Sequence, residues 1–139
     1  MAFDSLKRRQ MIRSTAGALS AGIAGCLNNS SPGKRTVDMT DGLVFEPATV
    51  TIARGGTVTW ENVGSVDHTV TAYENGIPSQ AAYFASGGFD SEQAARQQLS
   101  AGLIGAGGTY DHTFEVAGTY DYYCIPHESS GMVGTVRVK

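Results

Sequence analysis

Apolar and polar residues alternate with a period of two in several short runs, which is the pattern of half-buried β-strands. Val50 and Ile52 share one face of their run, and threonines occupy the other face. In the next run, Val58 and Trp60 are expected to face the core in the same way. Trp60 suits core filling better than an electron relay, because a large ring in a strand commonly fills a sandwich.

Turn-forming residues bound the other predicted strands. Pro47 predicts an edge strand or an irregular strand start, and Gly55-Gly56 predicts a tight hairpin turn between consecutive strands. Short strands in a chain rich in Gly, Thr and Val predict an all-β sandwich. The predicted strand segments are 37–39, 45–52, 57–60, 68–71, 109–114, 119–124 and 135–138.

Residues 73–108 depart from the strand pattern and form a long insertion rich in glycine. Residues 91–99 predict one short helix, with Asp90 or Ser91 as its N-cap and Glu92 in a first turn that favours negative charge. The insertion is expected either to dock a partner or to cover one edge of the sandwich. We favour the cover, because helices in all-β domains commonly protect edges. The expected packing face consists of Ala94, Ala95 and Leu99.

Length and charge limit the possible functions. About 110 of the 139 residues remain once a leader is removed, which is enough for one domain with a modest core. From Cys26 onward the chain holds 12 of its 13 acidic residues but 6 of its 10 basic residues, a net charge of about −6. This acidity argues against nucleic acid and is compatible with a basic partner or a salty medium. Both cysteines have other predicted roles, so no internal disulfide is expected.

Residues 1–26 have the organisation of an export signal, with a basic region followed by small, mildly apolar residues. The stretch is too short and too weakly apolar for a stable membrane span. Arg8-Arg9 resembles a twin-arginine signal, and Ala24-Gly25-Cys26 resembles the lipobox of bacterial and archaeal lipoproteins. We therefore expect export and a lipid anchor at Cys26; the alternative is a signal peptide that merely contains a cysteine. Residues 27–36 are expected to form a flexible tether before a folded domain at 37–139.

Three side chains with metal-binding chemistry gather near the C terminus in the spacing Cys-x2-His-x4-Met, formed by Cys124, His127 and Met132. One loop at this spacing turns all three toward a point, and His68 is the candidate for a fourth ligand. Two imidazoles and a thiolate with a weak axial thioether favour a single type 1 copper ion that transfers electrons. Zinc is the alternative, but methionine is not among its usual ligands. His112 lies in mid-strand, away from both ligand segments, and is expected to be structural.

The run 118–127 and the segment 131–136 resemble the blue copper proteins of the plastocyanin type, and most of all the halocyanins, which are membrane-anchored cupredoxins of haloarchaea. The resemblance covers most of the predicted domain and implies a cupredoxin-like Greek-key β-sandwich with one copper ion. It also implies that His127 exposes its ring edge among apolar neighbours and serves as the electron port. Thr69 departs from the pattern, which often has Asn or Asp directly after the first histidine ligand.

Three kinds of function remain for a copper domain of this sort. A membrane-tethered electron carrier would act as a monomer on the outer face of the cytoplasmic membrane, between membrane redox complexes. A copper storage or delivery protein would favour Met-rich or paired-Cys sites, which do not occur here. The type 1 part of a copper enzyme would need further histidines, but Tyr123 and Ile125 flank Cys124 and His112 is the only spare. The sequence therefore predicts an electron carrier and no enzyme.

Overall fold

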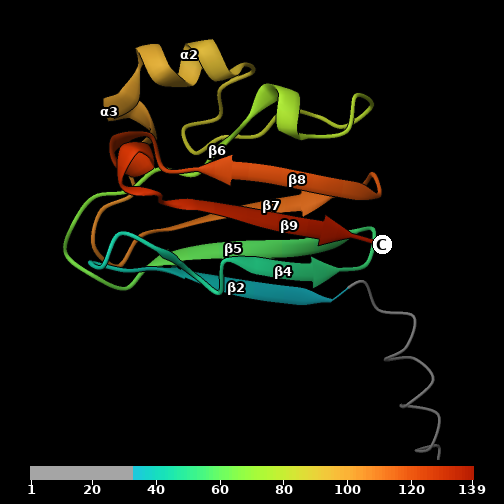
Figure 1. Cartoon of the computed structure of the whole chain (residues 1–139), viewed down its shortest axis with the longest axis horizontal. Helices are drawn as coiled ribbons and strands as arrows, with labels where there is room; N and C mark the ends of the chain where they lie inside the picture. The colour runs from blue at the N-terminus through green and yellow to red at the C-terminus, as the bar shows by residue number, and fades with distance from the viewer. Residues whose placement is uncertain (1–32) are drawn as a thin grey trace, which may run out of the picture. The chain divides into compact units, whose positions relative to one another are not determined.

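The computed structural model describes residues 33–139, which form two four-stranded sheets packed against each other (Figure 1). The strands of the first sheet lie in the order β3-β2-β5-β7, and those of the second in the order β4-β9-β8-β6. The strands are β2 (Lys34–Met39), β3 (Phe45–Glu46), β4 (Thr49–Ile52), β5 (Gly56–Asn62), β6 (Thr71–Ala72), β7 (Thr109–Phe114), β8 (Gly118–Tyr123) and β9 (Val133–Val138). The predicted all-β sandwich is confirmed. The predicted leader and Cys26 lie outside the described residues.

Strand β2 begins at Lys34, inside the stretch that the sequence predicts as a tether. It runs parallel to β5 over its whole length, from the pair Lys34 and Thr57 to the pair Met39 and Asn62. The first residues of β2 are exposed and polar, so the hydrophobic pattern carries no signal for them. Main-chain hydrogen bonding to β5 extends the strand beyond its apolar part.

The predicted hairpin at Gly55-Gly56 is wrong. Strand β4 pairs with β9 in the second sheet, whereas β5 pairs with β2 and β7 in the first, so the turn crosses from one sheet to the other. Both strands carry apolar residues on alternate positions, and placing them in opposite sheets lets both apolar faces meet in one core. Gly55 has a φ of +85°, which a glycine adopts without strain.

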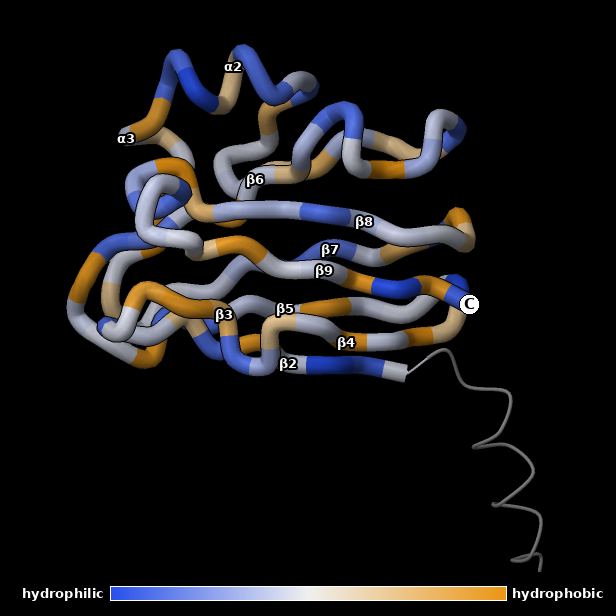
Figure 2. The backbone as a smooth tube through the Cα atoms, in the orientation of Figure 1, coloured by the Kyte–Doolittle hydropathy of each residue, from blue (hydrophilic) through white to orange (hydrophobic). Residues whose placement is uncertain are grey.

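Apolar residues recur along the strands in Figure 2, and the buried apolar side chains form one core cluster. Val58 and Trp60 are both fully buried, as predicted. The Trp60 ring lies edge-on to Tyr122 at 5.2 Å and packs beside Phe84 at 6.1 Å. Trp60 therefore fills the core, where such aromatic pairs add to the stabilisation from burial.

The insertion contains two short α-helices, α2 (Glu92–Gln97) and α3 (Leu99–Gly102), and the 3₁₀ turn η2 (Glu74–Gly76). The prediction of one continuous helix over residues 91–99 is wrong, because the backbone leaves the helical region at Gln98. Ser91 is the N-cap, and its side chain accepts a hydrogen bond from the Ala94 amide. None of the helices in residues 33–139 has the length and apolarity that a membrane span needs.

The insertion covers the outer edge of β6, the last strand of the second sheet. The amide of Ala72 donates to the carbonyl of Phe84, and Thr71 forms an isolated bridge with Ala85. Figure 1 shows α2 and α3 beyond this edge, next to β6 and β8. The insertion thus protects a sheet edge, as the sequence predicts.

Candidate metal centre

His68 lies in the connection between β5 and β6 and is fully buried. Its amide donates to the carbonyl of Ile104 at 3.2 Å, and the Ile104 amide donates back to the His68 carbonyl at 2.7 Å. The sequence predicts His68 at the start of a strand, but β6 begins only at Thr71 and His68 sits in an isolated bridge. The insertion therefore holds the backbone of this histidine.

Asn62 holds the loop that leads to His68. Its side chain is buried, donates to the carbonyls of Val66 at 2.8 Å and Ile104 at 2.9 Å, and accepts from the amide of Gly64 at 3.0 Å. A buried amide with its hydrogen bonds made in this way stabilises one loop conformation. The sequence alone does not predict this role, because Asn62 has the character of an ordinary loop residue there.

Asp41 braces the same loop from the connection between β2 and β3. Its carboxylate accepts hydrogen bonds from the amides of Ser65 at 2.8 Å and Val66 at 3.0 Å. The amides of Val66 and Ser65 hold the pKa of Asp41 below its usual value. A side chain at Gly64 would collide with this carboxylate, so the close approach requires glycine there. The sequence carries no local signal for this contact.

Cys124 directly precedes η3 (Ile125–Ser130), which contains His127, and this loop is closed by its own backbone. The Cys124 amide donates to the Met132 carbonyl at 3.1 Å, and the His127 amide donates to the Cys124 carbonyl at 3.1 Å. The Met132 amide donates to the His127 carbonyl at 3.2 Å. Gly131, with a φ of +89°, ends η3 and allows the chain to return. This loop and the His68 connection lie at the end of the sandwich opposite the C terminus (Figure 1).

The side chains of His68, Cys124 and His127 converge. The Sγ atom of Cys124 lies 3.7 Å from Nδ1 of His68 and 3.3 Å from Nδ1 of His127. All three donor atoms lie within 4.8 Å of one another. Taking zinc–ligand bond lengths of about 2.0 and 2.3 Å as a guide, a shared ion needs nitrogen–sulfur distances of about 3.5–3.8 Å. The distance from Sγ to Nδ1 of His68 lies in this range and the distance to Nδ1 of His127 is slightly shorter, so a small shift of the side chains would let all three atoms bind one ion.

Burial favours the uncharged forms of Cys124 and His68. Burial raises the pKa of the Cys124 thiol, although the Thr69 amide, which donates to Sγ at 3.3 Å, acts in the opposite direction. Burial, and then the neighbouring His127, lower the pKa of His68. A neutral imidazole is the form that binds metal, whereas the thiol must lose its proton to the solvent.

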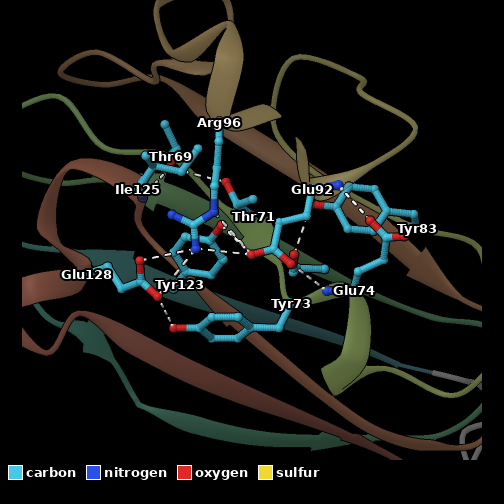
Figure 3. A network of polar contacts seen from close by, with 11 residues as sticks. Thr69, Thr71, Tyr73, Glu74, Tyr83, Glu92, Arg96, Tyr123, Ile125 and Glu128 are labelled. Atoms are coloured by element: carbon cyan, nitrogen blue, oxygen red, sulfur yellow. Dashed lines mark hydrogen bonds and ion pairs between the residues drawn. The ribbon is translucent and has the colours of Figure 1, made fainter. Parts of the chain in front are cut away.

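Thr69 ties the two ligand segments together, despite its departure from the Asn or Asp of the plastocyanin pattern. Its hydroxyl accepts a hydrogen bond from the amide of Ile125 at 2.8 Å (Figure 3), and its own amide donates to the Cys124 sulfur. Such contacts orient ligands and tune the metal. One threonine thus supports Cys124 from the segment that carries His68.

Met132 adds a thioether to the same loop, where its side chain is fully buried. With two imidazoles and a thiolate, it completes a donor set of the type 1 copper kind. His112 stays apart from this set, as predicted. Its ring stacks on Phe84 at 4.5 Å and meets the edge of Phe114 at 4.7 Å, so it has a structural place in the sandwich.

Residues 32–139 match the family described as copper binding proteins, plastocyanin/azurin family. The chain is 32% identical over 130 residues to the chloroplastic plastocyanin of Tetradesmus obliquus, covering 94% of this chain and 82% of that protein. It is 38% identical over 97 residues to the plastocyanin of Scenedesmus fuscus, covering 70% and 88%.

Solved structures agree with the sequence matches. The purple cupredoxin of Nitrosopumilus maritimus is 27% identical and has a TM-score of 0.56, over 76% of this chain and 99% of that one. The oxidised plastocyanin of Dryopteris crassirhizoma is 26% identical and has a TM-score of 0.53, over 75% and 99%. The donor set and the family point to the same metal, copper. The chain belongs to the plastocyanin/azurin family of copper-binding proteins.

Proposed function

We propose that this protein is an electron carrier that shuttles single electrons between redox proteins while holding one copper ion. The observation that carries the proposal is the arrangement of the donor atoms of His68, Cys124 and His127 around one point. When bound, copper would supply the one-electron couple. Cu(I) and Cu(II) prefer different geometries, so a site acceptable to both keeps the rearrangement on electron transfer small.

The residues around the ligands contribute rigidity. Thr69 joins the two ligand segments, and Asn62 and Asp41 fix the loop before His68. Cys124 would bind as a thiolate, His68 and His127 as neutral imidazoles, and Met132 as a weak thioether ligand. Because each support is a hydrogen bond inside the protein, the ligands would keep their positions in both oxidation states.

Electrons would enter and leave over His127, the less buried of the two histidines. The large apolar side chains that stand exposed include three in segments next to His68: Val63 at 52%, Val66 at 37% and Leu103 at 37%. Exposed apolar surface beside a redox centre is suited to brief docking. These residues support an encounter with a redox protein at this end of the molecule.

The cellular setting is part of the proposal and rests on the leader motifs. We place the protein among halocyanin-like carriers, exported through a twin-arginine signal and anchored by lipid at Cys26. Residues 27–33 would tether a monomeric domain to the outer face of the cytoplasmic membrane, within reach of membrane redox complexes. The chain would act as no enzyme by itself, since His112, the spare histidine, packs into the sandwich.

Electrochemistry of the copper-loaded protein tests this function. We expect a reversible one-electron wave, and we expect the copper to stay bound through repeated cycles in the presence of a Cu(I) chelator. A carrier must retain its metal in both states. Loss of copper to the chelator after the first reduction would favour copper delivery instead.

A further inference from the structure

The side chain of Arg96, on helix α2, contacts the ligand loop (Figure 3). Its guanidinium Nη2 donates to Oε2 of Glu92 at 3.1 Å and to Oε1 of Glu128 at 3.2 Å. Glu92 belongs to the same helix, whereas Glu128 belongs to η3 and directly follows His127. Arg96 thus joins the insertion to the segment that carries two of the proposed ligands.

The same guanidinium also contacts the residue that precedes Cys124 in the sequence. Its Cζ lies 4.5 Å from the ring centroid of Tyr123, the residue that precedes Cys124. The Tyr123 hydroxyl donates to Glu92 Oε2 at 2.9 Å, so ring and hydroxyl are both held by α2. A planar guanidinium is suited to this combination, because it stacks on a ring while it donates in its own plane.

Tyr73 completes the network from the start of the insertion. Its hydroxyl donates to Oε2 of Glu128 at 2.7 Å, and its ring stacks on Tyr123 at 4.2 Å. Burial and this hydrogen bond raise the pKa of Tyr73 to about 12, so the hydroxyl remains a donor at neutral pH. Both carboxylate oxygens of Glu128 therefore have partners, and the side chain has little freedom to move.

The backbone of the loop depends on the position of Glu128. The Gly131 amide donates to the Glu128 carbonyl at 2.9 Å, directly before the turn that returns the chain to Met132. The side chains of Arg96 and Glu128 are 41% and 33% exposed, so a single ion pair here would be weak. Two carboxylates, two tyrosines and one arginine acting together make a network instead.

We infer that Arg96 is a positioning residue for the metal site, which clamps Tyr123 and Glu128 and thereby holds Cys124 and His127 from both sides. The inference rests on the proposed function for its consequence, a copper site that is rigid in both oxidation states. It also gives the insertion a second role besides the protection of the β6 edge. Its hydrogen bonds and its ring contact go to Glu92, Glu128 and Tyr123, so Arg96 acts on the ligands through their neighbours.

The first test uses the full chain without copper. Arg96→Met keeps most of the apolar part of the side chain but loses the guanidinium group. In this variant we expect hydrogen exchange at the amides of Gly131 and Met132 to become severalfold faster. Arg54→Met is the matched control, because it removes the same charge from an exposed turn at the opposite end of the sheets. The control should leave these two amides unchanged.

The second test uses the copper-loaded protein. We expect Arg96→Met to release copper to a chelator about tenfold faster than the wild type and to change the copper hyperfine splitting in the EPR spectrum. Arg96→Lys, which keeps the charge, should release copper at a rate between those of the wild type and Arg96→Met. The double variant Arg96→Met/Glu128→Gln should speed copper release by less than the two single effects combined, because both substitutions break the same contact.

Two results would overturn the inference. One is an Arg96→Met protein with wild-type amide exchange, copper release and EPR spectrum. The other is an Arg54→Met protein that changes as much as Arg96→Met, since the effect would then be one of net charge. A wild-type protein that binds copper and is blue while Arg96→Met behaves normally would leave the proposed function intact, so the two failures are separable.

Discussion

The two regions of the sandwich are stabilised in different ways. In the middle, Trp60, Tyr122 and Phe84 fill the space between the sheets and bury large apolar surfaces. At the metal end, His68 and Cys124 are equally buried and Cys124 belongs to the same hydrophobic cluster, but its sulfur lies 3.7 Å from Nδ1 of His68. In the middle, the side chains stabilise the fold by packing, whereas the metal end also needs side-chain hydrogen bonds to hold polar groups in place.

The difference separates folding from function. Apolar packing alone would not bring two imidazoles and a thiol together, so metal binding explains their convergence at the metal end. Thr69, Asn62 and Asp41 each direct a side chain to the ligand loops rather than to the core. Substitutions in the core should therefore mainly affect the stability of the fold, and substitutions at the metal end should mainly affect copper binding.

The largest expected effect is in Cys124→Ser. This variant should lose the intense visible absorption completely, because that band requires a thiolate bound to copper. The fold should remain, since the substitution is nearly isosteric, and circular dichroism of the copper-free protein measures this. An intense band that survives in Cys124→Ser would remove Cys124 from the site.

The next effect tests the core. Trp60→Ala should lower the free energy of unfolding of the copper-free protein by about 3–5 kcal/mol, the usual cost of removing a large buried ring. The milder Trp60→Phe should lower it less, and its copper form should keep a wild-type spectrum. A changed copper spectrum in Trp60→Phe would contradict the separation of the two regions.

Thr69→Val changes the metal end, so we expect its main effect on copper binding rather than on the packing of the core. It removes the hydroxyl that accepts from the Ile125 amide but keeps the backbone amide that donates to the Cys124 sulfur. We expect copper affinity to fall by about 10–100-fold, as for other groups that orient ligands. Competition with a chelator of known affinity measures this. Thr57→Val, which removes an exposed hydrogen bond between β5 and β7, is the control and should bind copper normally; equal affinities for Thr69→Val and Thr57→Val would contradict the role of Thr69.

The smallest effect concerns pH. Burial alone would raise the pKa of Glu92, but hydrogen bonds from the Glu74 amide, Tyr123 and Arg96 outweigh it and lower the pKa below 4.5. A lowered folded pKa stabilises the protein above the unfolded value, and this contribution disappears as the pH falls through the folded value. The stability difference between wild type and Glu92→Gln, measured by denaturant unfolding without copper, should be constant at neutral pH and shrink below a pH of 4.5. A difference that stays constant down to a pH of about 3 would contradict the network.

The sequence predicts the local part of the site well. Cys124, His127 and Met132 lie in one loop, so their spacing alone predicts that they come together. His68 is predicted as the fourth ligand because a type 1 copper site needs a second imidazole. The supporting residues are a different matter. Asp41 and Arg96 act on segments 24 and 32 residues away, and no periodic pattern encodes a contact between a side chain and a distant loop.

The errors in the fold have the same origin. Gly55-Gly56 specifies a tight turn, but the same turn joins two paired strands or two sheets, and the choice depends on strands far along the chain. The break at Gln98 has no glycine or proline to announce it. Local chemistry therefore predicts elements and turns, while tertiary packing selects their partners.

X-ray absorption at the copper edge, on the oxidised and the reduced protein, tests the central claim most directly. The claim is that His68, Cys124 and His127 share one copper ion in a site that stays nearly unchanged on electron transfer. We predict two nitrogen ligands and one short sulfur ligand in both states, with small changes in bond length. Absence of the short sulfur, or a loss of nitrogen ligands on reduction, would contradict the account.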